Sequence, residues 1–139
     1  MRVVFDTNVV LDVLLAREPH AVIAAELFSL VETGRLEGAV CATTVTTVHY
    51  LAAKAAGGAA AERLVATLLD VFDVAAVDGT VLEGALALDL DDFEDGVVCE
   101  SARAIGAVGI VTRDRKGFAS APLPVYAPTE LLAAVRAAQ

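Results

Sequence analysis

The residues in this sequence that are most able to do chemistry are three aspartates at the edges of apolar segments. Asp6 directly follows an apolar run at the start of the chain, and Asp114 follows a second apolar run late in the chain. Asp95 ends an acidic run that leads into a helical segment. Ligands of open α/β sheets bind at the carboxyl ends of the strands. We therefore expect Asp6, Asp95 and Asp114 to meet at one edge of a sheet.

Three carboxylates at such an edge point to a divalent cation. Carboxylates held within several ångströms repel one another unless a cation or a proton intervenes. An ion bound by oxygen ligands alone, without cysteine or paired histidine, is typically Mg²⁺ or Mn²⁺. Such an ion can activate water against a phosphodiester. The sequence therefore predicts a metal site formed by Asp6, Asp95 and Asp114, with hydrolysis as its reaction.

Each aspartate also has a structural explanation when it is considered alone. Asp6 could cap the helix that follows it. Asp95 could lie in the first turn of a helix capped by Asp92, where the helix dipole favours acids. Asp114 could simply belong to the turn formed by residues 114–117. Only the three together favour a metal site.

Composition limits the class of protein. The chain has 139 residues, of which 57% are hydrophobic, so we expect one domain over residues 1–139. No apolar stretch approaches the roughly 18 residues that span a bilayer, and no leader pattern is present at the start. A cytoplasmic protein without membrane contact is expected. Cys41 and Cys99 lie in apolar segments without metal-type spacing, as buried thiols in a reducing compartment do.

The charge of the chain argues against broad binding to nucleic acid. The net charge is −9 and the pI is about 4.5, so neutralisation of many phosphates is excluded. The only basic cluster is formed by Arg113, Arg115 and Lys116 around Asp114. A solvated turn is one explanation for this cluster, and contact with a phosphate is the other.

Apolar periodicity and turn residues predict strands that alternate with helices. Strands are expected at 2–5, 36–41, 72–77, 108–111 and 124–126, and helices at 9–15, 19–33, 43–56, 59–69, 80–88, from the acidic run to 106, and from 129. Thr43 or Thr44 is expected to cap the third of these helices, and Phe93 and Phe118 are expected in the core. This order implies an α/β fold with a mostly parallel sheet of four to five strands flanked by helices.

Three segments together resemble the PIN domain family: Val-Val-Phe-Asp6-Thr-Asn8, Phe-Glu-Asp95 and Ile-Val-Thr112-Arg-Asp114. The resemblance covers nearly the whole chain, including the closing segment at 124–131. The family comprises metal-dependent ribonucleases, many of them VapC-type toxins of bacterial toxin–antitoxin pairs. The resemblance implies a PIN-like α/β fold, Mg²⁺ or Mn²⁺ as cofactor, an RNA substrate, a cognate antitoxin and a homodimer.

The resemblance also implies roles for single residues. Asp6, Asp95 and Asp114 match the acids that hold the metal in the family. Asn8 and Thr112 match polar residues that support the site: Thr112 would form a hydrogen bond near Asp6, and Asn8 would hold the loop.

Contact with RNA is expected from the basic residues near the site. Arg113, Arg115 and Lys116 are the first candidates for binding phosphates, followed by Arg17 and Lys54.

The sequence departs from the family at one position. Similar proteins usually carry a glutamate on the helix after the second strand, and the best register places His49 there. An imidazole could bind Mn²⁺ or donate a hydrogen bond, but it supplies no negative charge at neutral pH. Three acids suffice for one cation and make a second ion less favourable.

Other functions fit parts of the pattern. A PIN-like domain that lacks one acid could act as a binding module with little or no nuclease activity, through protein–protein contacts. A phosphohydrolase of the Asp-x-Asp type would need an acid where Asn8 stands. A receiver would carry its acceptor aspartate on a middle strand and not on the first.

Overall fold

Five parallel strands form the centre of the computed structural model, which describes all 139 residues. β1 (Arg2–Phe5) lies in the middle of the sheet. β2 (Glu37–Cys41) and then β3 (Asp73–Ala75) follow on one side, and β4 (Gly109–Val111) and then β5 (Val125–Tyr126) on the other. All four neighbouring pairs are parallel. The α/β class and the parallel sheet predicted from the sequence are confirmed.

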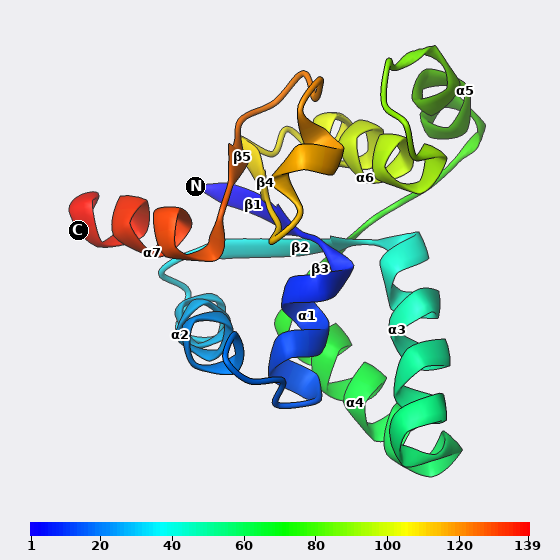
Figure 1. Cartoon of the computed structure of the whole chain (residues 1–139). Helices are drawn as coiled ribbons and strands as arrows, with labels where there is room; N and C mark the ends of the chain where they lie inside the picture. Colours follow the sequence, from blue (N-terminus) through cyan, green and yellow to red (C-terminus); the bar gives the residue numbers. More distant parts are fainter.

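Seven α-helices flank the sheet because parallel strands need crossover connections. They are α1 (Thr7–Leu14), α2 (Ala21–Glu32), α3 (Ala42–Ala56), α4 (Gly58–Val71), α5 (Gly79–Ala87), α6 (Phe93–Ala104) and α7 (Pro128–Ala137), and a short 3₁₀ helix, η1 (Arg115–Phe118), follows β4. Figure 1 shows α1 to α4 on one side of the sheet and α5 and α6 on the other. None of the seven helices is both long enough and apolar enough to cross a membrane.

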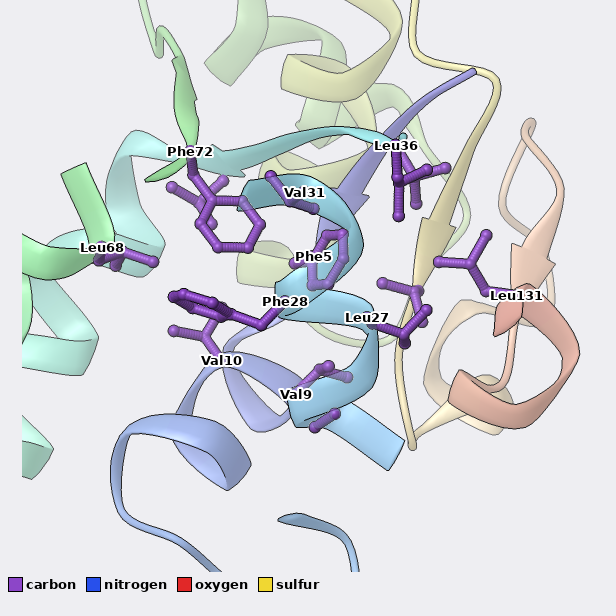
Figure 2. Close-up of a cluster of buried hydrophobic side chains, with 14 of the residues drawn as sticks. Phe5, Val9, Val10, Leu27, Phe28, Val31, Leu36, Leu68, Phe72 and Leu131 are labelled. Carbon is purple, nitrogen blue, oxygen red and sulfur yellow. The ribbon is translucent and has the colours of Figure 1, made fainter. Parts of the chain in front are cut away.

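Alternation along β1 divides the core into two layers. Val3 and Phe5 belong to the larger cluster, which packs against α1, α2, α4 and α7, while Val4 belongs to a second cluster against α5 and α6. In the larger cluster the ring of Phe72 stacks edge-on against Phe5 and Phe28, with centroids 4.9 and 5.1 Å apart. Figure 2 shows these three rings together. Both faces of the sheet are therefore buried, as expected for parallel strands.

Three local predictions were wrong. α3 begins at Ala42 with Cys41 as its N-cap, so Thr43 and Thr44 lie inside the first turn and cap nothing. The third strand is shorter than expected, since only Asp73–Ala75 pairs with β2. Phe118 is buried, but Phe93 is 47% exposed because it begins α6 at the surface.

Gly38 on β2 offers a test of this packing. A Cβ atom there would lie 2.7 Å from both Phe72 Cε1 and Val31 Cγ2, inside the core. Overpacking of this kind costs about 1–3 kcal/mol. We expect Gly38→Ala to lower the free energy of unfolding by that amount in urea denaturation. Gly58→Ala is the control, because a Cβ at Gly58 meets nothing within 4 Å and it should leave stability unchanged or slightly higher.

Candidate functional site

The register of β1 and β4 places Asp6 beside Thr112. Phe5 pairs with Val111, and the Asp6 N–H continues the ladder by donating to the Val111 carbonyl oxygen at 3.0 Å. At the next position, Thr112 Oγ1 donates to Asp6 Oδ2 at 2.8 Å. Thr112 is fully buried and Asp6 is 8% exposed. The predicted hydrogen bond between the two strand ends is present.

The Thr112 hydroxyl uses all of its hydrogen-bonding capacity. Besides donating to Asp6, it accepts from Asn8 Nδ2 at 3.1 Å and from the Asp114 N–H at 3.0 Å. Asn8 Oδ1 in turn accepts from the Arg113 N–H at 3.1 Å. Asn8 therefore connects the segment after β1 to the segment after β4.

The capping explanations also hold, but each engages only part of a carboxylate. Asp6 Oδ1 accepts from the Thr7 N–H at 2.9 Å, and Asp114 Oδ1 accepts from the Gly117 N–H at 3.1 Å. Asp92 Oδ1 caps α6 through the N–H groups of Glu94 and Asp95. Asp95 lies in the first turn of α6, where the helix dipole favours an acid, but its side chain accepts no hydrogen bond.

Asp95 and Asp114 approach one another across Gly117. A Cβ atom at Gly117 would lie 2.7 Å from Asp114 Oδ2 and 3.1 Å from Asp95 Oδ2. The absence of a side chain at Gly117 therefore leaves room for both carboxylates in these positions.

Asp6 and Asp95 open into one cavity of about 330 Å³. Threonines of α3 form one wall, and the first turns of α1 and α6 form the rest. The lining residues are Asp6, Thr7, Asn8, Leu11, Arg17, Thr43, Thr44, Thr47, Leu51, Glu94, Asp95 and Val98. Asp114 is exposed beside this cavity and does not line it.

Burial and mutual repulsion raise the pKa values of two of these acids. Burial is the largest effect on Asp6 and raises its pKa, although hydrogen bonds from Thr112 and Thr7 act in the opposite direction. Burial, and then the charges of Asp6, Asp92 and Asp114, raise the pKa of Asp95 to about 7. A cation would relieve this repulsion.

The donor chemistry of the cavity fits a hard cation. Its polar lining consists of carboxylate, hydroxyl and amide groups and the guanidinium of Arg17, with no histidine or cysteine. The structure contains no ready-made cluster of three or more Asp, Glu, His or Cys side chains that could hold an ion. The three aspartates lie near enough for Asp6 and Asp114 to raise the pKa of Asp95, but they are not already arranged around a single ion position.

The structure corrects the predicted register of α3. Thr43, Thr47 and Leu51, spaced by four residues, line the cavity. His49 is exposed and does not line it, so the register that placed His49 at the site is wrong. Helical periodicity explains the error, because two residues turn a helix by about 200°. Neither an imidazole nor a carboxylate of α3 reaches the cavity.

The basic residues predicted to bind RNA differ in whether a buried carboxylate engages them. Arg113 Nε and Nη2 donate to Asp12 at 2.6 and 3.1 Å, and Arg17 Nε donates to Asp12 at 3.0 Å. Arg113 is thus engaged by a buried carboxylate. Arg115 forms an exposed ion pair with Glu130, while Lys116 has no carboxylate partner. Lys54 lies away from the cavity, over the ring of Tyr50.

Three residues near the site were missed from the sequence. Glu94 lines the cavity, and its position beside Asp95 in a first helical turn was the available signal. Thr47 follows from the buried stripe Thr44, Val48 and Ala52, which fixes the face of α3. Asp12 is the one acid inside an otherwise apolar segment, a pattern that indicates a buried ion pair.

A sequence model of the PIN domain matches residues 2–116. The chain belongs to the PIN domain family. No significant match is found among curated protein sequences.

Several solved structures share the fold of this PIN domain. VapBC2 from Rickettsia felis, bound to a DNA fragment from its promoter, aligns with a TM-score of 0.71 and 15% identity, covering 91% of this chain and 98% of that one. A toxin–antitoxin complex from Klebsiella pneumoniae aligns at 0.69 with 21% identity, covering 91% and 97%. Mycobacterium tuberculosis VapC20, a toxin that cleaves the sarcin–ricin loop, aligns at 0.64 with 17% identity, covering 78% and 86%.

The sheet order bears on the receiver alternative. β1 is first in sequence but lies in the middle of the sheet, so the strand argument against a receiver does not hold. The receiver alternative is excluded because the chain belongs to the PIN domain family.

Thr112 is the natural residue for testing the network around Asp6. Thr112→Val removes the donor to Asp6 and the acceptor for Asn8 and Asp114, so we expect a loss of about 1–3 kcal/mol in unfolding free energy. Thr112→Ser keeps the hydroxyl and should lose much less. Equal losses in the two variants, measured by urea denaturation, would contradict the importance of the hydroxyl.

The raised pKa of Asp95 predicts a pH dependence of stability without metal. Its proton is held more tightly in the folded state, so the folded state loses stability as the pH rises from the unfolded value near 4 through about 7. Asp95→Asn removes this loss. With chelator at about pH 8, we expect its Tm to exceed that of the parent by roughly 3–5 °C, a shift that about 1 kcal/mol produces at this size, after allowance for solvent screening.

At about pH 2.5, well below the unfolded pKa, both states carry the proton, so Asp95→Asn and the parent should have similar Tm values. Asp91→Asn is the control, since Asp91 is an exposed acid of the same run and does not act on Asp95. A gain in Asp91→Asn equal to that in Asp95→Asn would attribute the effect to net charge.

Proposed function

We propose that this protein is an Mg²⁺- or Mn²⁺-dependent endoribonuclease that hydrolyses RNA phosphodiester bonds, and that it is the toxin of a toxin–antitoxin pair. One observation carries the proposal: Asp95 presents a half-buried carboxylate without any hydrogen bond to the cavity that contains Asp6. Its place in the first turn of α6 suits the helix dipole, but the dipole does not require the carboxylate to be partly buried beside other acids, whereas a cation between the acids would stabilise it there.

The fold relatives support the same class of function. The structures that align with this chain include toxin–antitoxin complexes and a toxin that cleaves the sarcin–ricin loop. These relatives are at most 21% identical in the cases compared, so they support the class and not the particular RNA.

Asp6, Asp95 and Asp114 would hold the ion. When bound, the ion would supply Lewis acidity and an activated water. Thr112 and Asn8 fix the Asp6 carboxylate so that it meets the ligand without further ordering. In the reaction, the water oxygen bonds to phosphorus while one bridging P–O bond breaks, and the leaving oxygen takes a proton.

The threonine wall of α3 supplies neutral hydrogen-bonding groups. Thr43, Thr44 and Thr47 face the cavity from the side opposite to the acids of α6. The Thr47 hydroxyl donates to the Thr43 carbonyl oxygen at 3.1 Å, and Thr44 is 2% exposed. The Thr43 hydroxyl, which contacts only Cys41 Sγ, is therefore the one that could donate to a phosphate or ribose oxygen without adding charge. This wall would bind the backbone of the substrate rather than a second ion.

The approach of RNA would use the basic residues of η1. Arg115 and Lys116 border a groove of about 460 Å³ whose other walls, including Phe118, Leu123 and Val125, are apolar. Both follow Asp114 in sequence, so a strand of RNA bound there would lie next to the acids. A local basic groove of this kind suits a chain whose net charge is −9.

A cognate antitoxin, a homodimer and a cytoplasmic location complete the proposed biology. The relatives solved as toxin–antitoxin complexes support the partner.

A second candidate is a PIN-like binding module with weak or no nuclease activity. It is favoured by one observation: α3 contributes no acid to the cavity, although the resemblance implies a glutamate on this helix. The two candidates differ in metal binding, because only the nuclease needs an ion at Asp6 and Asp95.

RNA cleavage tests the proposal directly. Pure protein is incubated with a set of structured RNAs in Mg²⁺, in Mn²⁺ or in chelator, beside Asp114→Ala and the control Asp91→Ala. We expect cleavage with either ion, none with chelator, background levels for Asp114→Ala, and parent levels for Asp91→Ala. Cleavage that persists in chelator would exclude the mechanism.

Metal binding separates the two candidates even if no substrate RNA is found. Mg²⁺ or Mn²⁺ should raise the Tm of the parent, and Asp6→Asn should remove that gain. No response to millimolar metal would favour the binding module.

A further inference from the structure

The end of α1 is built to hold Arg17 against the helix. The Arg17 N–H donates to the Asp12 carbonyl at 3.0 Å, and the Ala16 N–H donates to the Val13 carbonyl at 3.1 Å. This is the Schellman pattern, in which the residue before the last usually is glycine. Here Ala16 adopts a φ of 49°, a conformation unfavourable for an L-residue. The backbone is therefore strained at Ala16, where the chain turns back so that Arg17 lies against α1.

Two hydrogen bonds then fix the guanidinium of Arg17. Nε donates to Asp12 Oδ1 at 3.0 Å, and Nη2 donates to the Asn8 carbonyl oxygen at 3.1 Å. Nη1 donates to no protein atom, although the Arg17 side chain is only 39% exposed. The side chain is ordered by the protein, but one end of its fork is free.

Charge around Asp12 is not balanced. Its carboxylate is 1% exposed and pairs with both Arg17 and Arg113, so the group of three carries one positive charge in excess. Arg113 uses Nε and Nη2 on Asp12 and does not line the cavity. Arg17 does line it and is the only cation among the lining residues. The excess charge is therefore presented to the cavity through Arg17.

The cavity combines this cation with Asp6, Glu94 and Asp95, none of which forms an ion pair with Arg17. An arginine needed to neutralise these acids would contact them. An arginine held apart from them by its own buried counter-ion can accept an additional anion. The planar fork of arginine matches the oxygens of phosphate.

We propose that Arg17 forms a phosphate-binding subsite in this cavity and that Asp12 is its positioning residue. The ligand is a backbone phosphate of single-stranded RNA next to the bond that is cut, so the proposal rests on the proposed function and extends it. Of the arginines predicted to contact RNA, Arg17 binds the phosphate, while Arg113 belongs to the internal ion pair.

RNA binding, measured separately from cleavage, tests the subsite. A fluorescent single-stranded oligoribonucleotide is titrated with the full-length protein in Ca²⁺ in place of Mg²⁺, with intact RNA verified on a gel. We expect Arg17→Gln to raise Kd about 10-fold or more and to reduce the slope of log Kd against log salt by about 0.7, the value for one phosphate contact on a single strand. Arg17→Lys should recover only part of the affinity.

Arg103→Gln is the matched control. Arg103 is also paired with a carboxylate, that of Glu100, but it does not line this cavity. Its removal should change neither the affinity nor the salt slope beyond a small general effect of charge.

Asp12→Asn tests whether Asp12 affects RNA binding by positioning Arg17 or only through its own negative charge. Loss of a negative charge near the cavity should tighten RNA binding if Asp12 acts only through its charge, whereas loss of positioning should weaken it. Circular dichroism at the assay temperature confirms that this variant is folded. If it does not fold, the Arg17 variants decide the question alone.

The results distinguish this inference from the proposed function. Cleavage by the parent together with an Arg17→Gln variant that behaves like Arg103→Gln would overturn the subsite and leave the nuclease. If RNA binding depends on Arg17 but the parent shows neither cleavage nor a response to metal, the phosphate subsite is supported and the proposed nuclease activity is contradicted. An absence of RNA binding by the parent overturns the subsite.

Discussion

The parallel pairing of β1 with β4 is the constraint on which the site depends. It places the last residues of the two strands side by side, so that the segments after them leave the sheet at the same point. β4 is confined from its other side as well, since a Cβ atom at Gly109 would lie 2.6 Å from Tyr126 Cε2 and 2.9 Å from the Pro124 carbonyl oxygen. A shift of one residue in this register would turn Thr112 away from Asp6.

Two groups of charges meet at Asn8 on either side of α1. Its side chain belongs to the network of Thr112 and Asp6, and its carbonyl oxygen accepts from Arg17, whose other contact is Asp12. The acids of the cavity and the ion pair of Asp12 are therefore held by one residue, although they have opposite signs of net charge. A change at Asn8 would disturb both groups together.

The order of elements could be predicted because it depends on local patterns, whereas the contact of Thr112 with Asp6 was expected from the resemblance to the PIN family. An apolar run that ends in an acid indicates a buried strand, and parallel topology then fixes which ends are neighbours. The face of α3 was not recovered, because a run rich in threonine has weak amphipathic contrast and the register was taken from the resemblance, which placed His49 at the site. Asp12 was overlooked because its partner Arg113 lies 101 residues away, and sequence separation of that size hides an ion pair.

The burial of the aromatic residues shows the same limit. Phe118 and Phe93 both stand beside acidic segments, yet one is enclosed under the loop after η1 and the other projects from the first turn of α6. Each is a single aromatic residue in a polar or small-residue stretch, with no apolar periodicity around it. Tertiary contacts alone decide which of them is covered.

The two carboxylate oxygens of Asp6 both have structural roles, and this affects how such a residue would be conserved. One oxygen caps α1 and the other bonds to Thr112, so the residue serves the fold in addition to any reaction. A descendant that had lost its activity would still be selected to keep Asp6. Asp95, which accepts no hydrogen bond and carries a raised pKa, would be free to drift once no ligand needed it. Retention of Asp95 is therefore the better marker of a working lineage, and retention of Asp6 marks only a folded one.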